Sequence, residues 1–578
     1  MFNILFDKID ENYASFRVYV NDEKFAKSVE GYLYASLTFY DDSVKYTWEG
    51  REGFKSSKVY FYDRENHKLL IGLVPRACKL LQAQYQDIHI LVSNNLKKIY
   101  IPPFGKVSYD DIVKFSETLN LYNINENIKI IPYDHQIKII ERALNGRRIS
   151  LLACTAAGKS LSIYILVRYL MQIENRKVLL VVPSTNLVEQ MFSDFCYDYG
   201  WKEAETCCTR IYSNSKDKLK KTELLQLKKL NLNESVMLKQ LTISTWQSLQ
   251  NKEKSFFTYF DAVIIDEAHT TRGEELRDIL SSCINATNFK IGLSGTLPDD
   301  GLDAGYIEGA IGRKEDVVHL RELIEQNIIS PVEVNAVFVP YEHDLRPMIC
   351  GLQYKTEYSA LMNNNSRKQV MDILIKSGQI NIDHNIVMLY KNIVPLEEMH
   401  LFLKERYPQF KYHIIQGDIT TEDREKIRKL FEQSTGNFML ATYGCMKQGV
   451  NIKLLHDAIM AESAKSKYVI MQTLGRTVRK HKDKKCARIF DIVDDASYYT
   501  KPRTGYPQLK ENYMVKHYKE RQIYYAEENI PINEIRLDGL MSATIDVDSL
   551  KKKKADAINK MNTKNKINTN TYKKKFFR

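Results

Sequence analysis

The run ACTAAGKS at residues 153–160 combines small residues with a lysine and a hydroxyl group at a spacing that suits phosphate binding. It follows a short apolar run and precedes an apolar-periodic segment of helix length, which is the context that a P-loop requires. Main-chain N–H groups of such a loop surround a β-phosphate, and the positive end of the next helix points at the anion. We expect Lys159 to meet the β- and γ-phosphates and Ser160 to bind Mg²⁺. The expected phosphate-binding loop residues are Thr155, Ala156, Ala157 and Gly158. Ala153 stands where the general pattern has its first glycine, so the loop needs a second motif to support it.

That second motif lies about a hundred residues further on, where VIIDEAH ends an apolar run with Asp266 and Glu267. Carboxylates at the end of a buried strand are costly unless they have a function. Asp266 would hold Mg²⁺ through water, and Glu267 would orient and deprotonate an attacking water. His269 completes the run and is a further catalytic candidate. A chance GKS and a structural ion pair are the alternatives, but the order of the two motifs favours hydrolysis of ATP with Mg²⁺.

These motifs lie within alternating strand-like and helix-like segments. Runs rich in Val, Ile and Leu alternate with helix-length segments over 125–312 and again over 333–500. This alternation predicts crossover units and two buried parallel sheets, an α/β fold with two tandem domains. The remaining predicted segments are a small α+β accessory domain at 1–115, a linker at 313–332, a helical C-terminal extension at 501–540 and a basic disordered tail at 541–578. A charged segment at 216–239 with leucines at helical spacing predicts an inserted helix.

Charge is unevenly distributed along the chain. Of the formal net charge of +12, +10 lies in residues 550–578, where ten lysines and one arginine face a single acid, Asp556. The body is therefore close to neutral, and any nucleic-acid contacts there must come from local patches and main-chain amides. The tail could tether DNA, bind replication or recombination proteins, or be a solvated terminus.

The composition also excludes several classes of protein. The nine cysteines show no CxxC pair or zinc-ligand spacing, which favours a reducing compartment. The N-terminus has no secretory signal, and no apolar run approaches the length of a spanning helix. We therefore expect a soluble, cytoplasmic, monomeric protein that does not contact a membrane.

Two more stretches follow the P-loop and VIIDEAH, namely SGT at 294–296 and QTLGRTVR at 472–479. Together the four stretches resemble helicase motifs I, II, III and VI, in the order found in superfamily 2. The resemblance implies two tandem RecA-like domains. It also implies that Arg476 and Arg479 reach from the second domain to the γ-phosphate, and that Gln472 lies near the nucleotide. Arginine suits this role because its guanidinium stays charged and grips phosphate oxygens with fixed geometry.

Further stretches resemble the remaining motifs of that family. PYDHQ resembles a Q motif, which implies that Gln136 reads adenine and leaves His135 or Tyr133 to stack on it. The nucleic-acid candidates implied by the other motifs are Pro183, Ser184 and Thr185 (motif Ia), Thr245, Tyr390 (motif IV) and Thr442 (motif V), and Gly449 of motif V would lie near the nucleotide. For single residues in these motifs, capping of a strand end is an equal alternative.

From about residue 130 to 535 the chain resembles UvsW-type helicases of tailed bacteriophages. The similar stretches include IGLSGTL, IEGAIGRKEDVV, SKYVIMQTLGRTVRKH and DIVDDAS, and TWEGREG resembles that family's accessory domain. The resemblance implies action on branched DNA, with single and double strands, and on RNA–DNA hybrids during recombination, repair and replication in an infected host. The alternatives are a duplex translocase subunit of a restriction or remodelling complex and an ATP-switched nucleic-acid clamp.

Overall fold

The computed structural model describes residues 2–213, 233–362, 365–416, 421–444, 452, 454–464, 466–481, 483–500 and 505–540. The chain falls into two compact units, Met1–His319 and Leu320–Arg578. Most of the segment in which an inserted helix is predicted, 216–239, lies outside the described residues. Its described end contains the short helix η4 (Glu234–Met237).

The first unit begins with a small five-stranded sheet of order β5-β6-β2-β1-β7. Its strands are β1 (Phe2–Lys8), β2 (Tyr13–Tyr19), β5 (Tyr62–Asp63), β6 (Lys68–Leu70) and β7 (Ile88–Val92). Alternate residues of β1, namely Phe2, Ile4 and Phe6, are buried. They join an apolar cluster with residues of α1 (Glu23–Ser36) and α3 (Val74–Gln84). This part therefore has its own core of mixed strands and helices.

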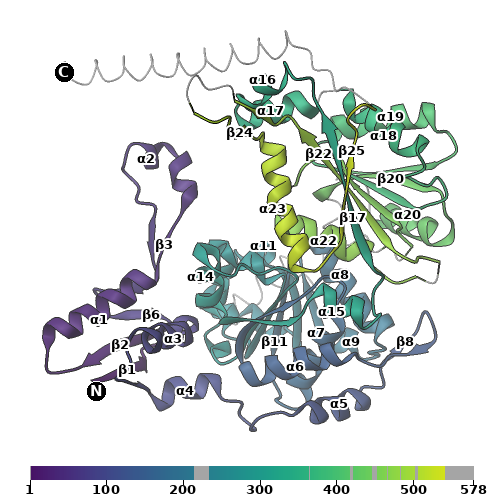
Figure 1. Cartoon of the computed structure of the whole chain (residues 1–578). Coiled ribbons are helices and arrows are strands. Elements are labelled where there is room, and N and C mark those ends of the chain that lie inside the picture. The colour runs from purple at the N-terminus through teal and green to yellow at the C-terminus, as the bar shows by residue number, and fades with distance from the viewer. Residues whose placement is uncertain are drawn as a thin grey trace, which may run out of the picture. The chain divides into compact units, whose positions relative to one another are not determined.

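An arm extends from this small sheet (Figure 1). It consists of β3 (Thr38–Tyr40) and β4 (Lys58–Tyr60), which pair antiparallel. Its outer end carries the short helices η1 (Asp42–Tyr46) and α2 (Trp48–Arg51).

The larger part of the first unit is a seven-stranded parallel sheet of order β12-β13-β11-β14-β15-β10-β16. The strands are β10 (Arg148–Ala153), β11 (Val178–Val182), β12 (Cys208–Ile211), β13 (Leu241–Thr245), β14 (Ala262–Asp266), β15 (Lys290–Ser294) and β16 (Arg313–Val318). The helices that concern the site are α6 (Asp134–Gly146), α7 (Lys159–Gln172), α8 (Thr185–Ser193), α11 (Trp246–Leu249), α13 (Glu274–Ser282) and α14 (Gly301–Ala310). Because the inner strands are covered on both faces, every residue of β11 is buried.

The second unit holds another seven-stranded parallel sheet, of order β19-β20-β18-β21-β22-β17-β25. Its strands are β17 (Val332–Pro340), β18 (Ile386–Tyr390), β19 (Lys411–Ile415), β20 (Asn437–Thr442), β21 (Asp457–Met460), β22 (Ala487–Asp495) and β25 (Ile532–Arg536). Its helices include α15 (Leu320–Glu325), α16 (Arg346–Cys350), α17 (Tyr354–Met362), α18 (Ser366–Lys376), α19 (Ile393–Arg406), α20 (Thr421–Gln433), α22 (Lys467–Thr477) and α23 (Tyr513–Glu527). Helices lie on both faces of this sheet (Figure 1).

The two parallel sheets share one topology. If the strands of each are numbered from one to seven along the chain, both have the spatial order 3-4-2-5-6-1-7. The predicted α/β fold with two tandem parallel-sheet domains is therefore confirmed. By this numbering β10 corresponds to β17, β15 to β22, and β16 to β25.

Two predicted segment boundaries need correction. Residues 313–318, expected in a linker, form β16 and extend the first sheet beside β10. The extension predicted at 501–540 contains the helix α23, but it also contributes β25, which pairs with β17 at the edge of the second sheet. Both strands are polar edge strands with one neighbour each, so they lack the continuous apolar run that marks an inner parallel strand.

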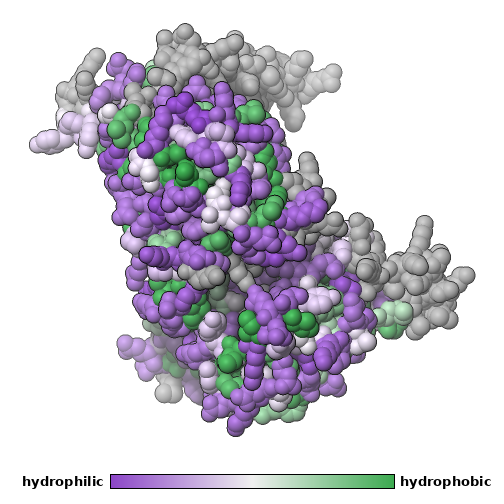
Figure 2. Space-filling model, turned by 90° about the vertical axis from the view of Figure 1, so that its right-hand side faces the viewer, coloured by the Kyte–Doolittle hydropathy of each residue, from purple (hydrophilic) through white to green (hydrophobic). Residues whose placement is uncertain are grey.

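The molecular face in Figure 2 is mostly hydrophilic, with apolar residues in small separate patches. Within the described part of the chain, none of the helices is long and apolar enough to cross a membrane.

Candidate active site

The P-loop connects the end of β10 to the start of α7. Its backbone takes the left-handed conformation at Ala156 (φ 76°) and Gly158 (φ 71°), which turns the chain sharply before the helix. The Ala157 N–H donates to the Cys154 carbonyl at 3.2 Å and closes the turn. The Lys159 ammonium donates to the Ala153 carbonyl at 3.2 Å, so the lysine folds back over the loop. This arrangement fits a phosphate, because main-chain donors, a helix start and an ammonium group converge on one small loop.

The amide of Gln136 on α6 braces this loop. Its Nε2 donates to the Ala157 and Gly158 carbonyls, each at 3.2 Å, and its Oε1 accepts from the Tyr133 N–H at 2.8 Å. Only 4% of Gln136 is exposed. A β-carbon at Gly158 would lie 2.3 Å from Nε2 and would displace this amide, and the positive φ also favours glycine here. The polar atoms of Gln136 are thus engaged with the protein, and adenine reading stays a prediction.

The two aromatic candidates for adenine stacking differ in exposure. His135 is buried and its Nε2 lies 2.8 Å from the Ala157 carbonyl oxygen, whereas Tyr133 is 51% exposed. The two rings stack, with centroids 5.6 Å apart and planes 13° from parallel. Of the two, Tyr133 has the accessible ring face.

The acidic pair lies at the end of β14. Glu267 takes the left-handed conformation (φ 54°), an uncommon one for a residue with a side chain. Its Oε2 accepts from the Ser294 hydroxyl at 3.2 Å and lies 3.3 Å from Nδ1 of His269. Ser294 and His269 are themselves 3.0 Å apart. These contacts fix the Glu267 carboxylate.

The pKa values of the two carboxyl groups are shifted in opposite directions. Burial and the neighbouring Glu267 raise the pKa of Asp266 to about 7. Burial alone would also raise the pKa of Glu267, but hydrogen bonds with His269 and Ser294 and the charge of Lys159 outweigh it and lower that pKa to about 2. Glu267 is therefore ionised at neutral pH and can accept a hydrogen bond from a water.

Strand order brings these groups together. β14, β15 and β10 are consecutive in the sheet. The register pairs Asp266 with Leu293 and Leu152 with Ser294, so the acidic pair, the SGT motif and the P-loop leave the same edge of the sheet. Sequence analysis recognised the SGT motif but missed Ser294 as the residue that links Glu267 to His269. The available signal was its position at the end of a strand beside the VIIDEAH strand.

The nucleic-acid candidates of the first unit follow β11 and β13, which are paired through Val182 and Thr245. Pro183 and Ser184 are partly exposed, and Thr185 is exposed at the start of α8. Thr245 is only 2% exposed and caps α11, where its hydroxyl accepts from the Ser248 N–H at 3.3 Å. For Thr245 the structure thus shows the capping role that sequence analysis held as an equal alternative.

The candidates of the second unit are divided between core and surface. Tyr390, the last residue of β18, is 1% exposed, and its hydroxyl lies within the core. The Tyr390 side chain thus belongs to the core of the second unit, and contact of this residue with nucleic acid stays a prediction. Thr442 ends β20 and is partly exposed, whereas Gly449 lies outside the described residues.

Motif VI occupies α22 and the residues after it. Gln472 and Arg476 are one helical turn apart, and Gln472 is 8% exposed. Arg479 follows the helix end, where its carbonyl accepts from the Ser330 hydroxyl at 3.4 Å. Burial and the nearby charge of Arg479 lower the pKa of Lys484 to about 7, and Lys484 donates to the Thr477 carbonyl at 2.7 Å. Cationic groups therefore gather at this helix end.

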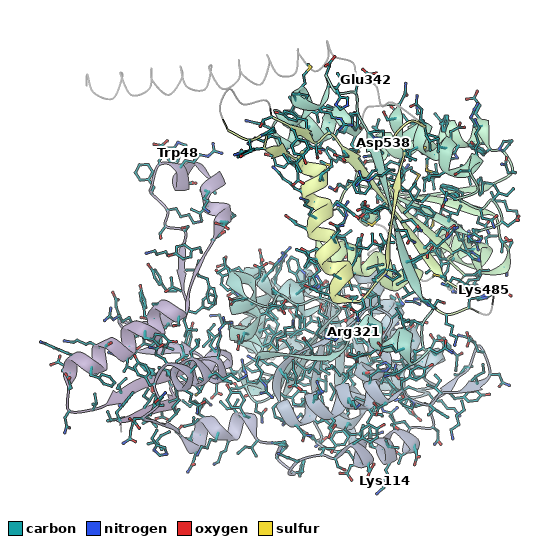
Figure 3. The ribbon with its side chains drawn as sticks, in the orientation of Figure 1. Trp48, Lys114, Arg321, Glu342, Lys485 and Asp538 are labelled. Atoms are coloured by element: carbon teal, nitrogen blue, oxygen red, sulfur yellow. The ribbon has the colours of Figure 1, made fainter. Side chains whose placement is uncertain are left out.

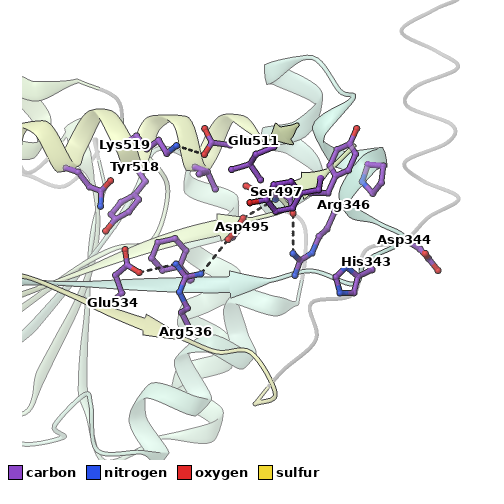
Figure 4. Close-up of a pocket in the computed structure, with 17 residues that line it drawn as sticks. His343, Asp344, Arg346, Asp495, Ser497, Glu511, Tyr518, Lys519, Glu534 and Arg536 are labelled. Carbon is purple, nitrogen blue, oxygen red and sulfur yellow. Dashed lines mark hydrogen bonds and ion pairs between the residues drawn. The ribbon is translucent and has the colours of Figure 1, made fainter. Parts of the chain in front are cut away.

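The second unit also contains a cavity of about 1040 Å³ at the ends of β17, β22 and β25 (Figure 4). Four of the charged side chains that line it form two ion pairs, Lys519 with Glu511 at 2.5 Å and Arg536 with Glu534 at 3.0 Å. It includes none of the predicted site residues.

Comparison with known proteins agrees with these motifs. Residues 129–299 match the family model "Type III restriction enzyme, res subunit", and residues 365–481 match "Helicase conserved C-terminal domain". Over both matched segments the chain is similar to helicases, and these matches support an enzyme that hydrolyses ATP. More specifically, it is related to the ATP-dependent DNA helicase UvsW of Enterobacteria phage T4, with 29% identity over 73% of this chain and 80% of the relative.

Other matches are more distant. A putative helicase of a Sulfolobus islandicus filamentous virus is 22% identical over 77% of this chain and 80% of its own length. The crystal structure of T4 UvsW aligns with 25% identity and a TM-score of 0.45, covering 93% of this chain and all of that one. The DNA-bound Type ISP restriction-modification enzyme LlaBIII shares the fold, with a TM-score of 0.50 and 15% identity over 81% of this chain and 34% of that one.

Proposed function

We propose that this helicase binds ATP with Mg²⁺ at the P-loop and uses its hydrolysis to remodel branched DNA and RNA–DNA hybrids in phage recombination, repair and replication. The observation that carries the proposal is the convergence of the P-loop, the acidic pair and the SGT motif on one sheet edge. The relative's DNA helicase activity supports DNA as the substrate. The setting would be the cytoplasm of the infected host, with the protein acting as a monomer.

Within this proposal each residue of the edge has a defined task. Thr155, Ala156, Ala157, Gly158 and Lys159 bind the phosphates through main-chain N–H groups and the ammonium. The Ser160 hydroxyl and the Asp266 carboxylate would hold Mg²⁺, which supplies positive charge beside the transferring phosphoryl group.

Glu267 accepts a hydrogen bond from the attacking water, because Ser294 and His269 hold its ionised carboxylate in one orientation. Arg476 and Arg479 stabilise the charge that develops on the γ-phosphate, a task suited to guanidinium groups. Pro183, Ser184 and Thr185, with Thr442, contact the nucleic-acid backbone, and such contacts give binding that weakens with salt.

The nucleotide site is tested by Lys159→Ala with Lys138→Ala as a matched control. Lys138 is an exposed lysine of α6 that pairs with Asp134 at 2.6 Å, away from the loop. Loss of the Lys159 ammonium should lower DNA-stimulated ATP hydrolysis by at least about 100-fold, as for other groups that stabilise transition-state charge. The control should hydrolyse at the parent rate. Parent-like turnover by Lys159→Ala would remove the P-loop from the mechanism.

The substrate is tested by strand displacement on three-way junctions, four-way junctions and RNA–DNA loops. The proposal expects ATP-dependent release of strands from these substrates. The match to a restriction-enzyme subunit favours a second candidate, a duplex translocase. A translocase would displace a third strand from a triplex without separating the duplex, so a triplex arm in the same assay distinguishes the two.

A further inference from the structure

The arm of β3 and β4 carries an unusual group of exposed aromatic residues. Trp48 is 64% exposed, Phe54 75%, Tyr40 60% and Tyr60 46%. Trp48 and Phe54 lie at the outer end of the arm, with ring centroids 5.6 Å apart and planes tilted by 34°. Figure 3 shows Trp48 at this end, away from the small sheet. Large aromatic groups clustered on a surface mark binding sites more often than single exposed side chains do.

The outer end keeps its shape without burying these two rings. The Asp41 carboxylate caps η1 by accepting from the Ser43 N–H at 2.9 Å, and the Thr47 hydroxyl donates to the Val44 carbonyl at 2.9 Å. The N–H of Phe54 donates to the Glu49 carbonyl at 2.8 Å. These polar contacts hold the turn while the rings of Trp48 and Phe54 pack against each other, with centroids 5.6 Å apart, and stay exposed.

The base of the arm is packed against the first parallel-sheet domain. A β-carbon at Gly305 of α14 would lie 3.0 Å from the Phe61 ring and 3.2 Å from the Phe39 ring, so the two rings pack closely against the helix backbone at this glycine. Arg76 forms ion pairs with Asp300 at 2.7 Å and with Glu308 at 3.1 Å. These two acids lie before and after Gly305 in the chain.

α14 begins a few residues after the SGT motif. The base of the arm is therefore held against the domain that carries the ATP-site motifs.

The chemistry of the outer end suits nucleobases. Tryptophan and phenylalanine offer flat faces on which any base can stack. Residues 41–58 carry four basic and four acidic side chains, so this part of the arm is neutral overall. The exposed ring faces, and not a basic patch, are therefore what suits the bases of a nucleic acid.

We propose that Trp48 and Phe54 form a stacking site for unpaired nucleobases at the branch of a DNA substrate. The proposal rests on the proposed function and names where that function would contact the branch. An arm that carries exposed aromatic faces and packs at its base against the ATP-site domain would engage bases only where a duplex opens. Fully paired duplex offers it no free base faces.

The test compares the full-length parent with Trp48→Ala, Phe54→Ala and a matched control, Tyr19→Ala. Tyr19 is 49% exposed at the end of β2, outside the arm. Binding is measured by fluorescence anisotropy on a fork with unpaired arms and on a blunt duplex. Each arm variant should bind the fork about tenfold more weakly, within the range for loss of one base–aromatic stack. Binding of the blunt duplex should change by less than about twofold, and the control should match the parent on both.

Tryptophan emission gives a second readout. The chain has three tryptophans, and of these Trp201 is 4% exposed and Trp246 is partly buried. Fork binding should quench the emission of the parent, and Trp48→Phe should abolish that quenching while binding the fork nearly as well as the parent. Unchanged emission, equal losses on fork and duplex, or parent-like binding by both alanine variants would overturn the stacking site. If no DNA stimulates ATP hydrolysis by the parent, the proposed function itself fails.

Discussion

Replacement of Gln136 by alanine separates two roles that one residue cannot fill at the same time. The sequence motif predicts that Gln136 reads the adenine edge, whereas the structure engages its amide with the Ala157 and Gly158 carbonyls and the Tyr133 N–H. If Gln136 braces the P-loop, its loss must affect every nucleoside triphosphate alike, because the loop binds phosphates and not the base. We expect kcat/KM for ATP and for GTP to fall by the same factor.

The size of that factor follows from the contacts. Three hydrogen bonds at about 0.5–1.5 kcal/mol each give a loss of about 1.5–4.5 kcal/mol. Water can reach Gly158, which is exposed, and can replace part of the loss, whereas Ala157 is 1% exposed and its carbonyl stays dry. A net cost of about 2 kcal/mol corresponds to a fall of about 30-fold in kcat/KM.

The assay is steady-state hydrolysis of ATP and GTP at saturating DNA, with Asn145→Ala as the matched control. Asn145 lies on the same helix, α6, and its amide makes a similar pair of hydrogen bonds, to the Val107 N–H at 2.9 Å and carbonyl at 2.8 Å. That control should lower thermal stability without changing kcat/KM. A fall confined to ATP, with GTP hydrolysis unchanged, would refute the bracing role and support adenine reading.

Two further predictions concern catalysis and stability. Ser294→Ala should lower kcat about tenfold with KM for ATP nearly unchanged, because Glu267 loses a hydrogen-bond partner that orients it; a change in KM alone would contradict this. Burial and the nearby His384 lower the pKa of His456 to about 4, and its Nδ1 accepts from the Asn385 N–H at 3.0 Å. Since the folded pKa lies below the unfolded one, stability is intact above about pH 6.5 and should fall as the pH drops toward 4. Chemical denaturation between pH 8 and pH 4 measures this, and His456→Gln should flatten the slope.

The ATP-site motifs could be predicted from sequence because their chemistry depends on position in the chain. The P-loop has a lysine and a hydroxyl at the start of an apolar-periodic helix. The acidic motif has two carboxylates at the end of an apolar strand. In both cases the sequence shows the reactive residue together with the element that carries it. Gln472 and Arg476 lie one turn apart on α22. The number of inner strands was also predictable, because each is a continuous apolar run.

Side-chain orientation at strand ends could not be predicted in this way. Thr245 and Tyr390 both end inner strands, yet one caps a short helix and the other enters the core. Whether a side chain at a strand end caps a helix or enters the core depends on the helices that pack over that strand end. Those helices come from other parts of the sequence. The edge strands β16 and β25 were missed for a related reason, since one-sided pairing leaves them polar.

The shared strand order shows which place in the second sheet corresponds to the P-loop of the first. The place in the second sheet that corresponds to the P-loop follows β17, where Tyr341 is buried and its hydroxyl donates to Asp494 at 2.8 Å. Asp494 also pairs with the buried Arg367. An aromatic ring and an ion pair therefore fill the space in which main-chain N–H groups would have to converge on an anion, and a carboxylate there opposes phosphate. The second sheet keeps the topology of the first, but Arg476, which motif VI implies for the γ-phosphate, lies on α22 and not after β17.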